Sequence, residues 1–529
     1  MWGCRWGLGQ ERRGGTPRWR SLIMLLPVMS AAAAAGLGAQ ESSAPQVERL
    51  RRALEAFVQA AEVPGATAAV APMDGGPVVA VAAGLADVEQ GVAMTPSHRM
   101  PAGSVGKTFV AAVVLSLVQD GVLHLDDSVS RWLGGEAWFE RVPNHEALTI
   151  RSLLSHTSGI PDHVYEDAFI ADVRRRVGQG SSPDFHYQPV ELVEFVLDRP
   201  PFAPVGHEYH YSDTNYILLG LIVETATGRT YEDLLRSRLL EPLGLTVTTP
   251  AQSRYLPGAA AGYAPGNALG LPEKVLTNDT MVFHPQTEWT GGGLVTSVSD
   301  LARWGRALVQ GRTVLDSATL ALMAEPTPAS RGRYGLGLST GGGPWGRTVG
   351  HDGWFPGYRT KLAWVPGAGV VVAVQVNRDV GVDLGRALQS LLDAWAGKPP
   401  ETGEAPSASA SCQPPPEGYE GHWQLSATSG SGARLPIALE LARDGDGYRG
   451  TWNPGPDVVW NVVGAVSEGA LRLRTEGPAR GSRRGEALPD GLVIEATRDR
   501  DGIRGWFSPV LGAGTGRIRL EWSGRYSCP

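Results

Sequence analysis

The first part of the chain alternates between helix-like and strand-like patterns of apolar residues. In residues 46–62 apolar side chains recur every three or four positions, which predicts an amphipathic helix. Two short apolar runs, 66–71 and 78–83, have the length and the flanking turn residues of strands. A longer apolar stretch, 105–120, predicts a buried helix.

Similar elements return after a middle part that is rich in loops. Residues 359–366 and 369–376 predict two strands joined by a Pro-Gly turn, and residues 382–396 predict a closing helix. Helix and strands therefore occur at both ends of the region 45–397. We expect an α+β domain in which early and late strands share one antiparallel sheet flanked by helices.

The pattern changes after residue 397. Residues 398–418 are rich in Pro, Ser and Ala, as is typical of a linker. In residues 419–529 short apolar runs alternate with Gly, Asp and Pro turns. This texture predicts a small all-β domain, either a barrel or a sandwich.

Residues 1–39 have the composition of a secretory signal peptide. Several arginines precede an apolar run at 22–37, and small residues follow it. An N-terminal membrane anchor is the alternative, but the run is short for a span and contains Pro27. We therefore expect a periplasmic or secreted protein that has no stable membrane span once this segment is removed.

Charge and cysteine content restrict the expected partners, disulfides and cofactors. The net charge of −7 and the absence of a basic run argue against a nucleic-acid partner. Cys412 and Cys528 bracket the C-terminal domain and could form a disulfide in an exported protein. The cysteines form no metal-ligand pattern, and we expect neither a metal nor a cofactor.

Residues 103–108, Gly-Ser-Val-Gly-Lys-Thr, are the first candidate for chemistry. They end like a phosphate-binding loop, but that motif requires glycine where this chain has Pro101. The alternative is a Ser-x-x-Lys pair, Ser104 and Lys107, on one face of a helix start. An amine in this place can take the proton of a serine nucleophile. A helix-capping serine followed by a surface lysine is the structural alternative.

Two further motifs favour the catalytic interpretation. Tyr211-Ser212-Asp213 precedes a predicted helix, and His351-Asp352-Gly353 precedes the two late strands. A Ser-x-x-Lys motif followed by a polar triplet and a third motif ending in glycine is typical of penicillin-recognising enzymes.

With these motifs, the chain resembles the serine β-lactamase-related family. That family includes class C β-lactamases, D-alanyl-D-alanine carboxypeptidases, D-aminopeptidases and esterases. The resemblance covers about residues 46–396 and implies a β-lactamase/transpeptidase-like fold with a helical subdomain. The C-terminal part resembles, more weakly, the β-barrel appendages of some members. Further matching segments are 121–127, 153–159, 215–220, 241–245 and 292–294.

The resemblance also implies roles for individual residues. Ser104 would attack a carbonyl, and Lys107 and Tyr211 would share the proton transfers. The backbone N–H groups of Ser104 and Trp354, the latter next to Gly353, would form the oxyanion hole.

His351 stands where many relatives have lysine, so its grip on a substrate carboxylate would be weaker and pH-dependent. Asp213 stands where the family more often has Asn, and Asp352 where it has Thr or Ser. Both departures argue against efficient β-lactam hydrolysis, because a carboxylate repels an anionic substrate and donates no hydrogen bond. Asp213 could instead receive a free α-amino group.

Other residues near these motifs have more ordinary interpretations. We expect His156 to hold its loop by hydrogen bonds and the run Gly291–Gly293 to mark a close backbone approach. Trp354, Phe355 and Tyr358 would either line an acyl pocket or only pack. His207 and His210 have no third ligand nearby, which favours a structural role over a metal site.

The sequence thus predicts an exported serine hydrolase that cleaves a small-molecule ester or peptide through an acyl-enzyme on Ser104. One alternative is a peptidase or carboxypeptidase specific for D-amino acids in cell-wall-type peptides. Another is a catalytically silent binder of such peptides. The sequence does not define the oligomeric state.

Overall fold

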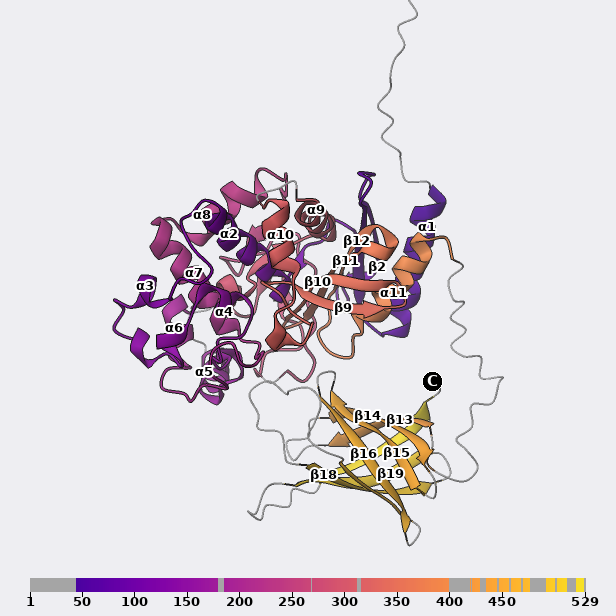
Figure 1. Cartoon of the computed structure of the whole chain (residues 1–529). Coiled ribbons are helices and arrows are strands. Elements are labelled where there is room, and N and C mark those ends of the chain that lie inside the picture. The colour runs from indigo at the N-terminus through magenta and orange to yellow at the C-terminus, as the bar shows by residue number, and fades with distance from the viewer. Residues whose placement is uncertain are drawn as a thin grey trace, which may run out of the picture. The chain divides into compact units, whose positions relative to one another are not determined.

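The computed structural model describes residues 44–178, 185–267, 269–311, 315–398 and 419, followed by eight strands between residues 421 and 527 (Figure 1). The predicted signal peptide, most of the predicted linker, Cys412 and Cys528 lie outside these residues. Export and the disulfide therefore stay predictions.

A seven-stranded antiparallel sheet forms the centre of the first part, with the order β3-β2-β1-β12-β11-β10-β9. Strand β1 pairs with β12, and Ala69 lies opposite Ala373. The expectation that early and late strands share one antiparallel sheet is confirmed. The strands are β1 (Gly65–Pro72), β2 (Val79–Asp87), β3 (Val92–Ala93), β9 (Ser339–Gly343), β10 (Gly346–Phe355), β11 (Tyr358–Val365) and β12 (Val370–Val376).

Helices cover both faces of this sheet (Figure 1). The first helix, α1 (Ala44–Ala60), and the last, α11 (Leu384–Trp395), pack together over one face. Helix α9 (Val298–Val309) packs on the other face, against β1 and β12. Strand β1 is buried on both sides, which explains why its sequence is a continuous apolar run.

A helical subdomain lies beside the sheet, built around α2 (Lys107–Gln119) and α7 (Asp213–Thr227). Helix α2 is buried from Lys107 to Leu117, because its residues are apolar nearly all round. The other helices are α3 (Ser130–Leu133), α4 (Ile150–Leu154), α5 (Asp167–Gly178), α6 (Pro189–Glu194), α8 (Tyr231–Leu235) and α10 (Ser317–Ala324). Short strands complete this part: β4 (Met100–Pro101), β5 (Thr249–Pro250), β6 (Leu276–Thr277), β7 (Thr280–Met281) and β8 (Leu294–Thr296).

The described elements of the C-terminal part are all antiparallel strands, as the sequence predicts. Each strand pairs with the next, and β20 also pairs with β13, which closes the ladder into a barrel. Leu439, Leu441 and Trp452 are buried in it. The strands are β13 (Gly421–Thr428), β14 (Arg434–Asp444), β15 (Gly447–Gly455), β16 (Val458–Ser467), β17 (Ala470–Thr475), β18 (Gly491–Asp499), β19 (Gly502–Val510) and β20 (Leu520–Ser527).

Within the described residues, no helix combines the length and the apolar character that crossing a bilayer requires.

Candidate active site

Ser104 and Lys107 lie one turn apart where the chain enters α2. Ser104 belongs to a short 3₁₀ turn, Gly103–Gly106, and Lys107 is the first residue of the α-helix. Lys107 Nζ donates a hydrogen bond to Ser104 Oγ at 3.1 Å. Because the Lys107 side chain has no exposed surface, the alternative of a surface lysine does not fit this geometry.

The buried ammonium of Lys107 is enclosed by polar and aromatic groups. It lies 2.5 Å from Asp213 Oδ1 and donates a hydrogen bond to the carbonyl oxygen of Gly291. The rings of Tyr211 and Tyr216 lie 5.0 and 5.4 Å from it. A carboxylate, a carbonyl and two aromatic faces together compensate the loss of water around the cation.

Tyr211 is held against Lys107 by His156, a role that the sequence interpretation missed. The two rings are stacked with centroids 4.1 Å apart. His156 Nδ1 accepts hydrogen bonds from the backbone N–H of Ser212 and from Asn215 Nδ2, both at 3.2 Å. His156 therefore does hold its loop, as expected, and it also fixes the plane of the Tyr211 ring.

The His-x-Gly motif precedes the strand pair β11–β12, as the sequence predicts, and itself lies in β10, a strand that the sequence analysis did not predict. His351 is paired with Leu362 of β11 and Gly353 with Thr360. The run around the motif is rich in Gly and polar residues, so it lacks the alternating apolar pattern that marks a strand.

Strand β10 lies directly against the turn that carries Ser104. A Cβ atom added to Gly103 would lie 2.7 Å from the backbone nitrogen of Trp354, and one added to Gly353 would lie 2.0 Å from Ala102 O. This close approach brings the backbone of Trp354 beside that of Ser104, where the predicted oxyanion hole requires it.

The predicted close approach of Gly291–Gly293 is also present. A Cβ atom added to Gly106 would lie 2.6 Å from the carbonyl oxygen of Gly292. One added to Gly292 would lie 2.4 Å from Gly103 O, and Gly292 has a φ of +150°. Backbone therefore packs on backbone here, and this packing aims the carbonyl of Gly291 at Lys107.

The predicted substrate-binding residues Asp213 and Asp352 lie in different environments. Asp213, whose side chain is 16% exposed, lies at the centre of the site. Asp352 is on the opposite face of β10 from His351, is 69% exposed and pairs with Lys361 at 2.6 Å. Neighbouring residues of a strand point to opposite faces, so the side chains of Asp352 and His351 diverge, and a role of Asp352 in substrate binding stays a prediction.

The three aromatic residues after the motif separate into two kinds. Phe355 and Tyr358 are buried in the core, and Tyr358 Oη donates to the carbonyl oxygen of Ala260 at 2.8 Å. Trp354 is 36% exposed and is the one of the three available to a ligand.

Two acidic residues that the sequence did not single out surround Asp213. Asp162 Oδ1 accepts the backbone N–H of Asp213 at 3.1 Å. Glu288 Oε2 is buried without a hydrogen-bond partner among the described residues. Burial, and then the nearby carboxylate of Asp213, raise the pKa of Glu288 to about 8.

His163 lies next to this group on the η4 turn (His163–Tyr165). Its Nδ1 is 3.0 Å from Thr214 Oγ1, and the ring is buried. Burial lowers the pKa of His163 to about 4, so the ring is neutral at neutral pH.

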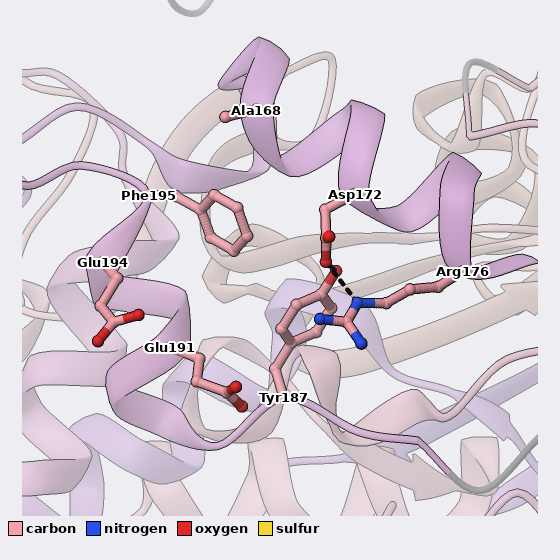
Figure 2. Close-up of a pocket in the computed structure, with 7 residues that line it drawn as sticks. All are labelled: Ala168, Asp172, Arg176, Tyr187, Glu191, Glu194 and Phe195. Carbon is pink, nitrogen blue, oxygen red and sulfur yellow. Dashed lines mark hydrogen bonds and ion pairs between the residues drawn. The ribbon is translucent and has the colours of Figure 1, made fainter. Parts of the chain in front are cut away.

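His210 and a cavity in the helical subdomain are two further candidate features. His210 is stacked on Phe202 at 3.9 Å, and the described part of the chain contains no group of three potential metal ligands. A cavity of about 290 Å³ lies between α5 and α6, where Arg176 is paired with Asp172 (Figure 2). Its lining residues are Ala168, Asp172, Arg176, Tyr187, Glu191, Glu194 and Phe195.

The chain is similar in sequence and fold to several known proteins. Residues 50–394 match the family model described as Beta-lactamase. Penicillin-binding protein 4 of Amycolatopsis lactamdurans is 31% identical over 355 residues, which cover 63% of this chain and 86% of that protein. A D-aminopeptidase of Cereibacter sphaeroides is 26% identical over 492 residues, which cover 91% of this chain and 82% of that protein. The crystal structure of a D-stereospecific amidohydrolase from a Streptomyces species matches with a TM-score of 0.57 and 28% identity, covering 66% of this chain and 98% of that one.

Proposed function

Because this chain belongs to the beta-lactamase family and is a serine hydrolase, we propose that it cleaves amides and short peptides of D-amino acids that carry a free α-amino group. The observation that carries the proposal is the carboxylate of Asp213 beside Ser104 and Lys107. The likeness to a D-aminopeptidase and to a D-stereospecific amidohydrolase supports the same substrate class.

The charges around the nucleophile favour a cationic group on the substrate. Asp213 contacts Lys107, the partner of Ser104, and the carboxyl group of Asp162 lies at the backbone N–H of Asp213, so the ammonium of Lys107 offsets one of two carboxylate charges. A protonated α-amino group is attracted to a carboxylate, whereas an anionic β-lactam is repelled. Asp213 also lacks the N–H donor that an asparagine would offer to a substrate carbonyl.

The reaction follows from the positions of the named groups. Ser104 Oγ attacks the substrate carbonyl carbon, and its proton passes to the Lys107–Tyr211 pair. The backbone N–H groups of Ser104 and Trp354 stabilise the developing oxyanion. The C–N bond then breaks, and the leaving amine receives the proton. Water attacks the acyl-enzyme, which releases the D-amino acid and restores Ser104.

The test compares substrates that differ only in the α-amino group or in chirality. D-alanyl p-nitroanilide is expected to be hydrolysed with a kcat/KM about 100-fold above its N-acetylated form, which is about 2.7 kcal/mol in transition-state binding. The L-alanyl analogue is expected to react as slowly as the acetylated one. Ser104→Ala is the control, and it should abolish turnover and labelling by a fluorophosphonate.

Two results would contradict the proposal. One is equal hydrolysis of the free and N-acetylated substrates. The other is a clear preference for short-chain p-nitrophenyl esters, which would make the chain an esterase with the same nucleophile. The absence of any turnover together with retained peptide binding would favour the silent binder.

A further inference from the structure

His351, the residue that replaces lysine in the third motif, has a partner on both ring nitrogens. Its Nδ1 lies 2.6 Å from the backbone carbonyl oxygen of Asp352. Its Nε2 lies 2.8 Å from Tyr334 Oη. The sequence interpretation did not identify Tyr334.

In a neutral imidazole these two contacts define the tautomer. A carbonyl oxygen only accepts hydrogen bonds, so Nδ1 of His351 must carry the hydrogen. Burial raises the pKa of Tyr334 well above its usual value, so the phenol keeps its proton and can donate it to Nε2. His351 is itself buried, and the two groups that contact its ring nitrogens, a carbonyl and a phenol, are uncharged.

Tyr334 is rigidly placed for this contact. Its backbone N–H donates to Ser330 Oγ at 3.0 Å, and its carbonyl oxygen accepts the N–H of Thr327 at 2.9 Å. Its ring lies edge-on to that of His351, with centroids 5.5 Å apart, and 4.9 Å from the ring of His156. Tyr334, which contacts His351, is thus packed against His156, which fixes the ring of Tyr211.

Asp352, the other ionisable residue of the His351-Asp352-Gly353 motif, points away from His351. The carboxylate of Asp352 points to the opposite face of β10 and pairs with Lys361. Opposite His351 on β11 stands Leu362, which is apolar. The imidazole therefore presents no cation at this edge of the site.

We propose that Tyr334 is a specificity-determining residue that holds His351 neutral and so excludes substrates whose leaving group carries a free carboxylate. The inference rests on the proposed function for its substrates and deepens it. Among D-aminoacyl peptides, the site would accept amides and peptides blocked at the C-terminus. It would reject free dipeptides, which need a cation at this position.

The experiment compares D-alanyl-D-alaninamide with D-alanyl-D-alanine, which differ in one terminal carboxylate. The wild-type protein is expected to favour the amide by at least about tenfold in kcat/KM. In Tyr334→Phe the imidazole loses its donor and can take up a proton, so the carboxylate-to-amide ratio should rise about tenfold. Tyr334→Phe combined with His351→Lys adds a permanent ammonium and should make the carboxylate substrate the better one.

The matched control is Tyr231→Phe, which also removes a buried tyrosine hydroxyl but in α8. It should leave the carboxylate-to-amide ratio unchanged. A ratio that is the same in the wild-type protein and in Tyr334→Phe would overturn the inference. Equal use of both substrates by the wild-type protein would do so too.

A second readout separates this inference from the proposed function. In protein with ¹⁵N-labelled histidine, the His351 resonances, assigned with His351→Gln, report which ring nitrogens carry hydrogen. We expect a neutral ring with hydrogen on Nδ1 at neutral pH, and a change at Nε2 in Tyr334→Phe. If no D-aminoacyl substrate is hydrolysed, the proposed function fails, and these resonances alone decide the inference. A doubly protonated ring in the wild-type protein would exclude it.

Discussion

Lys107 Nζ lies 2.5 Å from Asp213 Oδ1 and 3.1 Å from Ser104 Oγ, and the lysine side chain is fully buried. The lysine therefore joins the nucleophile to a carboxylate. Removal of either charge leaves the other one in a site with little water, which is more costly than the loss of an exposed ion pair.

Lys107→Met should lower the free energy of unfolding by about 3–5 kcal/mol, because it leaves the largely buried carboxylate of Asp213 without its cation. The double variant Lys107→Met/Asp213→Asn should recover most of this loss, and both variants should be inactive. Urea unfolding followed by circular dichroism measures the stabilities. Arg141→Met, which breaks an exposed pair with Asp198, is the control and should change stability little. If the losses of stability caused by Lys107→Met and Asp213→Asn simply add in the double variant, the two charges are not coupled.

Glu288→Gln should change how stability depends on pH. The pKa of Glu288 is about 8 in the folded chain and near 4.5 in the unfolded chain. Between these values the unfolded chain binds fewer protons than the folded one, so stability falls as pH rises, by at most about 1.4 kcal/mol per pH unit. The variant should match the wild-type Tm near pH 4.5 and exceed it at pH 8. Glu241→Gln, at an exposed position, should have the same dependence of Tm on pH as the wild-type protein. If Glu288→Gln also has this dependence, the pKa of Glu288 is not raised in the folded chain.

His163→Gln tests the opposite side of the pH range. The pKa of His163 is about 4 in the folded chain and near 6.5 when unfolded. Below 6.5 the unfolded chain takes up a proton that the folded chain does not, so stability is lost as pH falls from 6.5 to 4. The wild-type Tm should drop more steeply than that of the variant in this range. His124→Gln, at an exposed residue, serves as the comparison, and equal slopes for all three proteins would rule out the effect.

Gly106→Ala should damage the site through the backbone. Its Cβ would lie 2.6 Å from Gly292 O, so the turn that holds Lys107 must move. We expect a fall in kcat of about 100-fold and a loss of about 1–3 kcal/mol in stability. Gly135→Ala, where an added Cβ meets nothing within 4 Å, should leave both unchanged. Normal activity in Gly106→Ala would show that the turn can move without loss of catalysis.

The sequence predicts those features that depend on local pattern. The amphipathic α1, the apolar α2 and the strands β11 and β12 follow from the spacing of apolar residues. The pairing of early with late strands follows from the symmetry of elements around the loop-rich middle. Ser104 and Lys107 follow from a short motif whose residues share one helical turn.

Other features of the site depend on contacts between residues far apart in the chain. Tyr334 meets His351, and Glu288 lies near Asp213, yet no spacing rule connects either pair. The strand β10 is missed because its role is to bring backbone against the Ser104 turn, and glycines serve that contact better than apolar side chains. The separate orientations of His351 and Asp352 could not be predicted, because the alternation of a strand was not expected there.

The pairing of β1 with β12 has a consequence for synthesis of the chain. Strand β1 leaves the ribosome early, but its partner follows only at Val370–Val376. At usual elongation rates the gap is roughly 15–60 s, during which an apolar strand edge has no native neighbour. The nucleophile is made in this interval too, before Tyr211 and His351 exist. Until β12 has been translated, the nascent hydrolase therefore exposes one apolar strand edge, which is a site for unwanted pairing with other chains.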